Sequence, residues 1–365
     1  MRRIYMDYNA TAPVRPEVIS SVSDALLETG NASSIHGFGR NARKLVEDAR
    51  EEVSKLVDVR STQVIFNSGA TEGNNTILSG YQDKKVFISS IEHPSIIEAA
   101  PNAQKIPVTK DGVIDIEAFK KMLSEKPTLV CVQLVNSETG AIQPVAEISK
   151  LAKDAGALVL CDAVQAAGRL EIDFKALGVD YVTLSAHKFG GPQGTGALIF
   201  REGLQIPKFL RGGGQEKRQR AGTENVACIA GMGVAAKLAK ADLAQFQTHT
   251  KLFQTKLESA LRSVANDLII VAENALRVSN TTNIILPDVS AETGVMAMDL
   301  EGIAVSSGSA CSSGTFKPSH VLNAMGYSEK QAGCALRFST GWATTSADID
   351  ETLAAFTRIT ARLKK

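Results

Sequence analysis

Two apolar runs close together constrain the fold of this chain more than any other feature. Residues 157–188 read ALVLCDAVQAAGRLEIDFKALGVDYVTLSAHK, and the runs Ala157–Cys161 and Asp180–Leu184 each predict a buried strand. Polar side chains follow the two runs directly: Asp162, Gln165, Ser185, His187 and Lys188. Ligands in open α/β sheets bind at the carboxyl ends of strands, so the stretch predicts a ligand site at one sheet edge.

The rest of the chain repeats this alternation of strand and helix. Helical patterns cover 16–27, 43–56 and 145–155, the small polar segment 30–40 predicts a loop, and 194–200 predicts a strand behind a glycine-rich turn. Solid apolar strands between helices predict an α/β fold with a mostly parallel sheet and helices on both faces. Long helical segments over 234–265 then lead into a part with fewer strands.

The change in pattern predicts two domains. We expect a large domain over 13–240 and a smaller α+β domain over 241–365, which the N-terminal segment 1–12 joins. A length of 365 residues suits this division, because single cores stop growing at such sizes.

Composition excludes several classes of protein. A formal charge of +1 predicts no strong attraction to nucleic acid or to anionic membranes. The N-terminus lacks the apolar core of a signal peptide, and no apolar run is long enough to span a bilayer. The cysteines suggest no disulfide framework, the histidines have no metal-ligand spacing, and we expect a cytoplasmic protein. Three cysteines in apolar runs are predicted to be buried: Cys131, Cys161 and Cys228.

The motif Ser68-Gly69-Ala70-Thr71 lies between a predicted strand and a predicted helix. Free backbone N–H groups at Ala70 and Thr71 and the positive end of the helix would favour a phosphate. Read alone, the motif equally suits an ordinary helix cap.

His93 and Asn136 follow the ends of two further predicted strands. An imidazole at this edge could stack on a flat cofactor ring and move protons, or simply bond to backbone in a loop. The Asn136 amide could bind a ligand or form an Asx turn. Together with Asp162 and Lys188, these strand ends supply what a pyridoxal phosphate (PLP) site requires. A lysine forms the Schiff base, and a carboxylate holds the ring nitrogen protonated.

A second focus is SSGSACSSG, residues 306–314, whose small and polar residues predict a loop rather than core. Cys311 lies within it and would be an accessible nucleophile. Arg337, in the strand pattern CALRFST, could bind a substrate carboxylate or form a structural ion pair. The loop 211–225 combines three consecutive glycines with four basic residues and could contact an anion.

With these residues in place, the chain resembles the cysteine desulfurases of the NifS/IscS kind, in the class V aminotransferase group of fold-type I PLP enzymes. The resemblance implies a mostly parallel sheet of seven strands in the large domain. The segments that carry the resemblance run nearly end to end, and SAHKFGGPQG and SGSAC are the most specific of them. The others include YMDYNATAP, NSGATEGNN, EHPS, NSETGAIQP, CDAVQAAG and GGGQEKRQRAGTEN.

The resemblance implies a role for each candidate. Lys188 would bind PLP covalently, Asp162 would pair with the ring nitrogen, Gln165 would contact the phenolic oxygen and His93 would stack on the ring. The phosphate would be held by Ala70, Thr71, Ser185 and His187, with Thr223 supplied by the other subunit of a homodimer. Asn136 and Arg337 would bind the carboxylate of L-cysteine, and Cys311 would accept its sulfur as a persulfide. No metal is implied.

Some positions depart from the family pattern. Gln215 replaces a usual histidine, and Trp342 stands where an arginine is common. The sequence stops at ARLKK, before the tail with which some members dock an iron–sulfur scaffold, so the sulfur-acceptor protein stays open. The alternatives are a selenocysteine lyase, an aminotransferase for small amino acids, or a non-catalytic protein on the same fold. The serine-rich segment around Cys311 favours the desulfurase, because transamination needs no nucleophilic cysteine.

Overall fold

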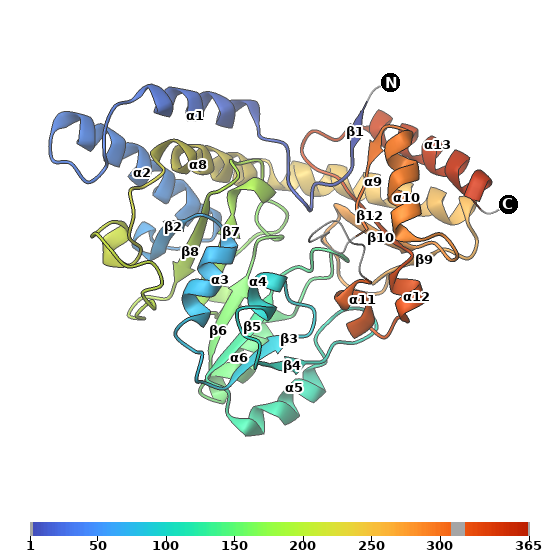
Figure 1. The fold of residues 1–365 in the computed structure, drawn as a ribbon, viewed down its shortest axis with the longest axis horizontal. Helices are drawn as coiled ribbons and strands as arrows, with labels where there is room; N and C mark the ends of the chain where they lie inside the picture. The colour runs from blue at the N-terminus through green and yellow to red at the C-terminus, as the bar shows by residue number, and fades with distance from the viewer. Residues whose placement is uncertain (1–2, 308–317, 364–365) are drawn as a thin grey trace.

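A large mostly parallel sheet forms one half of the molecule, and two small sheets with their helices form the other (Figure 1). The structure is a computed structural model, and it describes residues 3–307 and 318–363. The seven-stranded sheet has the order β2-β8-β7-β6-β5-β3-β4. Its strands are β2 (Val64–Asn67), β3 (Val86–Ser89), β4 (Gln104–Ile106), β5 (Leu129–Gln133), β6 (Leu158–Asp162), β7 (Tyr181–Ser185) and β8 (Gly196–Phe200).

Strand β8 runs antiparallel to both of its neighbours, β7 and β2, while the remaining pairs are parallel. Six strands therefore share one direction, and their carboxyl ends meet at one edge. The predicted α/β class and the mostly parallel seven-stranded sheet are confirmed.

Helices bury both faces of this sheet. Alternate residues of one strand belong to different cores: Val130 and Val132 pack with α2, α6 and α8, whereas Leu129 and Cys131 pack with α3 and α4. Burial on both faces is why the strands are continuous apolar runs. The helices of this half are α1 (Pro16–Leu27), α2 (Gly37–Leu56), α3 (Ala70–Leu78), α4 (Pro94–Ile97), α5 (Ile116–Met122), α6 (Val145–Asp154), α7 (Phe174–Leu177) and α8 (Val226–Ala241).

The other half has its own apolar core, to which the N-terminal residues Ile4 and Met6 belong. Strand β1 (Ile4–Tyr5) pairs with β11 (Ile303–Ala304), and a second sheet has the order β12-β10-β9. Its strands are β9 (Ile269–Ile270), β10 (Thr281–Ile285) and β12 (Ala335–Ser339), and its helices are α9 (Leu243–Val264), α10 (Ala291–Leu300), α11 (His320–Ala324), α12 (Glu329–Ala332) and α13 (Ser346–Leu363). The domain boundary near residue 240 stays a prediction.

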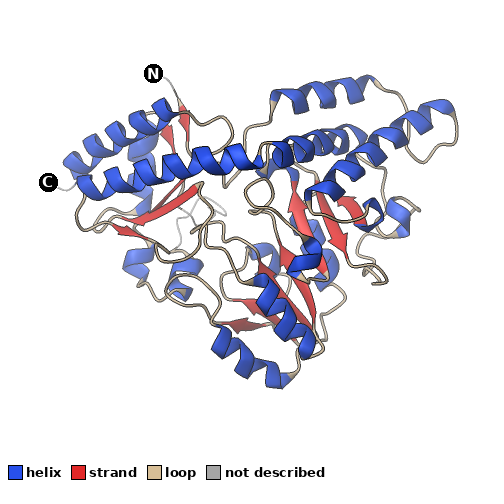
Figure 2. Ribbon diagram, turned by 180° about the vertical axis from the view of Figure 1, so that it is seen from behind, coloured by secondary structure: helices blue, strands red, loops and turns tan. Residues whose placement is uncertain are grey.

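The long helix α9 runs from the end of α8 across to the small sheets (Figure 2). The predicted helical segment 234–265 is in fact part of two helices, α8 and α9, which are separated at Asp242. Asp242 forms a 2.6 Å ion pair with Arg15, which connects the junction of the two helices to the chain segment that precedes α1.

Two local predictions are wrong. The loop expected over residues 30–40 ends early, because α2 begins at Gly37, and His36 caps this helix by accepting the Gly39 N–H. Gly39 lies in the first turn of α2 and packs closely against the preceding segment, since a Cβ there would lie 2.4 Å from the Ser34 carbonyl oxygen. Cys131 and Cys161 are buried as expected, but Cys228 is partly exposed at the first turn of α8.

Candidate active site

Most of the predicted cofactor residues line one pocket of about 210 Å³ at the carboxyl edge of the large sheet. They come from the ends of four strands that are far apart in sequence: β2, β3, β6 and β7. The predicted residues on its wall are Ala70, Thr71, His93, Asp162, Gln165, Ser185, His187 and Lys188. The residues that follow the predicted strand ends therefore meet at one concave site.

The turn before α3 forms one end of the pocket. Gly69 has φ +148°, a conformation that L side chains rarely adopt, and it directs the chain into α3. The Ala70 N–H donates to the Ser185 Oγ over 2.9 Å, which fixes that hydroxyl beside the first turn of α3. The helix end, the Thr71 side chain and Ser185 together offer donors and a positive dipole suited to a phosphate group.

Asp162 lies at the end of β6 with its carboxylate held by the protein. Its Oδ2 accepts from the Asn74 side chain over 3.2 Å, and its Oδ1 accepts from the Val164 N–H over 3.0 Å. Asn74 is fully buried, donates to Ser95 Oγ and accepts from Thr183 Oγ1. This network fixes the direction of the carboxylate toward the pocket, where it could bind one protonated ring nitrogen.

His93 is exposed toward the pocket and caps α4. Its Nδ1 accepts from the Ser95 N–H over 3.1 Å and lies 2.8 Å from Ser95 Oγ. Loss of hydration lowers the pKa of His93, while the Asp162 charge opposes that shift. The ring is therefore held in one orientation and favours the neutral form that can exchange protons.

Lys188 follows β7 and donates from Nζ to two backbone carbonyls, those of Asn9 at 2.5 Å and Ala10 at 2.8 Å. Burial, followed by the charges of Arg169 and Arg337, lowers the pKa of Lys188 to about 7. Burial and Lys188 likewise lower the pKa of His187 to about 4. A lysine with such a pKa is partly a neutral amine at neutral pH, which is the form that attacks a carbonyl.

Gln165 sits between the pocket and a buried arginine. Its Oε1 accepts from Arg169, and its Nε2 donates to the Asn9 carbonyl over 3.0 Å. Both contacts fix the amide, so its orientation is set before any ligand arrives.

Arg337 and Asn136 lie at the border between the two halves and are not on the wall of this pocket. Arg337 donates to Asp7 over 2.7 Å and to the Ser137 carbonyl over 3.0 Å, so the structural ion pair weighed from the sequence does exist. Asn136 Oδ1 accepts the N–H groups of Glu138 and Thr139, which is the Asx turn. Substrate binding by these two residues stays a prediction.

Cys311 lies outside the described residues, but the chain on either side of it is fixed near the pocket. Ser306 pairs with Arg337 through two backbone hydrogen bonds of 3.1 and 2.6 Å. On the other side, Ser319 Oγ donates to Glu138 over 2.5 Å, and His320 Nε2 lies 3.0 Å from the Glu92 carbonyl oxygen. The chain thus enters and leaves the segment 308–317 beside Arg337 and His93.

Three remaining candidates lie away from the pocket. Thr223 is exposed on the loop before α8, so its predicted contact with a partner subunit's cofactor stays a prediction. Gln215 accepts the Gly222 N–H over 3.2 Å and closes its own loop. Trp342 donates to the Pro13 carbonyl over 3.0 Å, and the Arg15 guanidinium lies 5.3 Å from its ring centre.

The sequence reasoning missed the residues that hold the candidates in place. Asn9 connects the amine of Lys188 with Gln165, Asn74 supports Asp162, and Asp7 pairs with Arg337. Asp7, Asn9 and Asn74 are all polar residues within the motifs YMDYNATAP and NSGATEGNN. Their place within these motifs was the only available signal. A polar residue in a motif does not indicate which side chain it will contact.

Comparison with known proteins agrees with this arrangement. Residues 4–352 match the family described as Aminotransferase class-V. The chain belongs to this family. Cysteine desulfurase IscS of Dictyoglomus turgidum is 37% identical to it over 378 residues, which cover all of this chain and 96% of the relative. Cysteine desulfurase NifS of Azotobacter vinelandii is 35% identical over 378 residues, which cover all of this chain and 94% of the relative.

Solved structures of similar proteins have the same fold. The X-ray structure of a NifS-like protein from Rickettsia africae has a TM-score of 0.92 and 37% identity, and the match covers 98% of this chain and 99% of that one. The resemblance to NifS/IscS desulfurases that the motifs suggested is confirmed. Within the described residues, no helix is long and apolar enough to cross a membrane.

Proposed function

We propose that this class V aminotransferase relative is a cysteine desulfurase that converts L-cysteine to L-alanine and transfers the sulfur to Cys311 as a persulfide. The observation that carries the proposal is the pocket that joins Lys188, Asp162 and His93. Relatives named cysteine desulfurase that match the whole chain support it. SspA, 26% identical with a TM-score of 0.82, was solved in complex with cysteine.

The donor set fits pyridoxal 5'-phosphate. The α3 end with Ala70, Thr71, Ser185 and His187 would hold the phosphate, and Gly69, at φ +148°, brings the backbone into this turn in a conformation that L side chains rarely adopt. Asp162 would bind the ring nitrogen, Gln165 the phenolic oxygen, and His93 would lie against the ring. When bound, this cofactor would draw electrons from the substrate Cα.

The residues of the chain would then have separate tasks. Arg337 and Asn136 would hold the substrate carboxylate, with Arg337 already oriented by Asp7 and Ser137. Lys188, whose lowered pKa of about 7 leaves the amine mostly neutral at higher pH, would take the proton from the substrate Cα. His93 would move the proton of the substrate thiol. The Cys311 thiolate would attack the substrate sulfur, so that an S–S bond forms while the C–S bond breaks and its electron pair stays with the substrate. A proton taken up at Cβ and the Cα proton returned by Lys188 would complete L-alanine.

The position of Cys311 in the chain favours the desulfurase over an aminotransferase. Both flanks of its segment contact residues beside the pocket, Ser306 at Arg337 and His320 at the Glu92 carbonyl. A small-amino-acid aminotransferase would have no use for a cysteine there. A selenocysteine lyase shares the PLP pocket, and only its substrate preference separates it from a desulfurase.

The test is to supply the purified enzyme with L-cysteine and a reducing thiol and to quantify alanine and sulfide together. We expect equal amounts of both from the unmodified enzyme. Cys311→Ala should retain the bound cofactor but lose both products, and Cys228→Ala is the matched control because Cys228 lies on α8, outside the pocket lining. Full activity of Cys311→Ala, or cysteine consumption without alanine, would refute the proposal. Selenocysteine supplied in parallel identifies a lyase.

We also propose a homodimer in the cytoplasm that passes sulfur to an acceptor protein. Large apolar side chains are exposed on α1, around the start of α2 and on the loop before Arg211: Leu26, Leu27, Ile35, Phe38, Phe209 and Leu210. Helices α1 and α2 and the chain that leads into α8, which includes Thr223, lie on the same side of the molecule (Figure 1). Ile35 is 88% exposed, which favours coverage by a second subunit. Light scattering of the holoenzyme should give twice the 38.8 kDa chain mass.

A further inference from the structure

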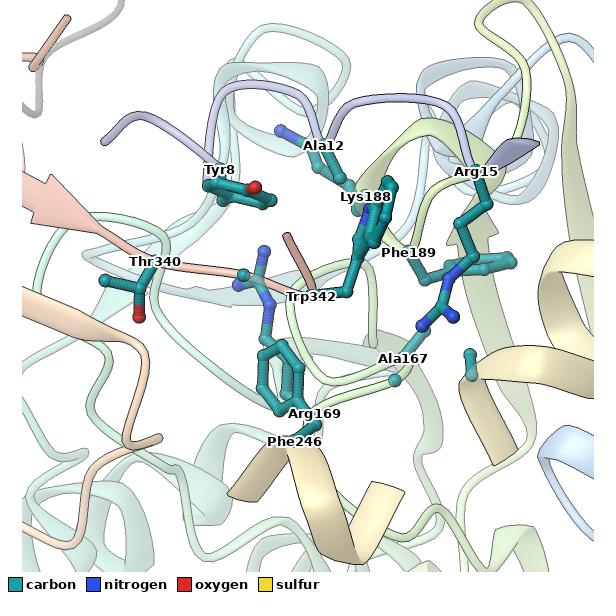
Figure 3. Close-up of a pocket in the computed structure, with 13 residues that line it drawn as sticks. Tyr8, Ala12, Arg15, Ala167, Arg169, Lys188, Phe189, Phe246, Thr340 and Trp342 are labelled. Carbon is teal, nitrogen blue, oxygen red and sulfur yellow. The ribbon is translucent and has the colours of Figure 1, made fainter. Parts of the chain in front are cut away.

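A small cavity lies behind Lys188 and shares only this residue with the candidate cofactor pocket. We call it the rear cavity. Its walls come from the N-terminal segment, the turn after Ala166, α9 and the segment after β12, as Figure 3 shows. Its volume is about 20 Å³, which holds one water-sized particle or one monatomic ion.

The charges around the rear cavity do not balance. Its wall includes Arg15, Arg169 and Lys188 and no carboxylate. Arg15 is neutralised by its 2.6 Å ion pair with Asp242, and Lys188 is partly neutral near pH 7. Arg169 is only 4% exposed, and among the described residues its side chain bonds to the uncharged Gln165 amide and to no acid. One buried positive charge is left without a counter-charge.

The polar side-chain atoms at the cavity that lack a partner among the described residues can all donate a hydrogen bond. Arg15 is 9% exposed and Thr340 is 4% exposed, and neither Arg15 Nε nor Thr340 Oγ1 has a hydrogen-bond partner among the described residues. Arg169 has five N–H donors and spends one of them on Gln165. In Figure 3 the Arg169 guanidinium extends toward Tyr8, while Arg15 approaches from the opposite side of Trp342. Buried donors without partners are costly, and an anion would satisfy them.

We propose that the rear cavity is a binding site for a small monovalent anion of the halide class, with Arg169 as its charged ligand. A water molecule could accept hydrogen bonds there but would leave the guanidinium charge unbalanced. The volume suits a monatomic ion better than a carboxylate or a phosphate group. A second, wider pocket of about 190 Å³ shares Arg15, Phe246, Gly341 and Trp342 with the rear cavity and would give the ion a path from solvent. The site does not depend on the reaction proposed above.

The chain carries its own probe, because Trp342 is its single tryptophan and lines the cavity. We would titrate the holoenzyme with potassium bromide, a heavy-atom quencher of indole fluorescence, while potassium sulfate keeps the ionic strength constant. Saturable quenching of Trp342 that added chloride reverses is the expected result. Quenching that rises linearly without saturation, and that chloride leaves unchanged, would overturn the proposal.

Variants at Arg169 connect the signal to the site. Arg169→Gln keeps a polar side chain without the charge and should lose the saturable component, whereas Arg169→Lys should retain it with a higher midpoint. Equal saturable quenching in all three proteins would mean that Arg169 is not the ligand. If Arg169→Gln does not fold, crystals of the unmodified holoenzyme soaked in bromide give the answer. An anomalous peak in the rear cavity supports the proposal, and density without such a peak refutes it.

Discussion

Two regions around Lys188 differ in how the sequence brings their residues together. The first is the carboxyl edge of the large sheet, where Thr71, Asp162 and Ser185 each follow a strand within a few residues. The second, which we call the seam, is where the N-terminal segment meets the second half: Asp7, Asn9, Asn280, Thr281 and Arg337. Asp7 and Arg337 are 330 residues apart in the chain, yet their side chains are 2.7 Å apart.

The comparison shows which contacts a local pattern can predict. In a parallel sheet, strand direction alone brings carboxyl ends together, so a residue that follows a strand is already placed. The seam has no such rule, because its contacts depend on how two cores pack. If the comparison is right, changes at the sheet edge should remove chemistry. Changes at the seam should alter stability and the charge of Lys188, in addition to any loss of substrate binding at Arg337.

The largest effect is expected at the sheet edge for Lys188→Ala. The variant loses the amine that attaches the cofactor and takes the Cα proton, so desulfuration should fall by roughly 10³-fold or more. The visible absorbance of the attached cofactor should also disappear from the protein after gel filtration. Lys175→Ala is the control, because Lys175 is an exposed lysine on α7. Visible absorbance that persists through gel filtration of Lys188→Ala would contradict the assignment.

A smaller loss is expected for Asp162→Asn, which keeps the shape of the side chain and removes its charge. The contact with Asn74 can survive, because an amide oxygen still accepts a hydrogen bond. We expect kcat to fall by roughly 10²-fold while the cofactor stays bound, since only the charge that favours the protonated ring is lost. Asp154→Asn, at an exposed residue at the end of α6, is the control. A kcat within twofold of the unmodified enzyme would exclude a role for the Asp162 charge.

The same contrast explains how far the sequence predicts this molecule. Apolar runs predicted β6 and β7 to within one residue, because a fully buried strand has few alternatives. Composition misjudged residues 37–40, where glycines open α2 through the His36 cap rather than continuing a loop. The support of Asp162 by Asn74, and of Lys188 by Asn9, could not be predicted, because each needs two segments to meet in space.

At the seam, a double-mutant cycle of Asp7→Ala and Arg337→Ala measures the ion pair. The side chains are 19% and 5% exposed, so each single change leaves a largely desolvated partner. We expect each to lower the free energy of unfolding by about 2 kcal/mol, and the double variant to lose clearly less than the sum. Urea denaturation of the three variants gives the coupling. Strict additivity would mean that the two side chains do not interact, and the seam would then be no more than a packing surface.

The smallest effect is a pH dependence that both regions control. The pKa of Lys188 is lowered to about 7, first by burial and then by Arg169 and Arg337, while Asp7 and Asp162 raise it. Only the neutral amine attacks the cofactor aldehyde. The rate of cofactor attachment to the apoenzyme should therefore rise roughly tenfold between pH 6 and pH 8, instead of increasing steadily toward pH 10. Stopped-flow absorbance measures this rate directly.

Variants on the two sides of Lys188 should move this midpoint in opposite directions. Asp7→Asn removes a negative charge from the seam, so the pKa of Lys188 should fall and the midpoint should shift to lower pH. Arg169→Gln removes a positive charge beside Gln165, so the midpoint should shift to higher pH. A wild-type midpoint near pH 10, or equal midpoints in both variants, would show that burial and neighbouring charges do not determine the pKa of the Lys188 amine. Opposite shifts would show that the seam, which no local pattern predicts, tunes the lysine that the sheet edge positions.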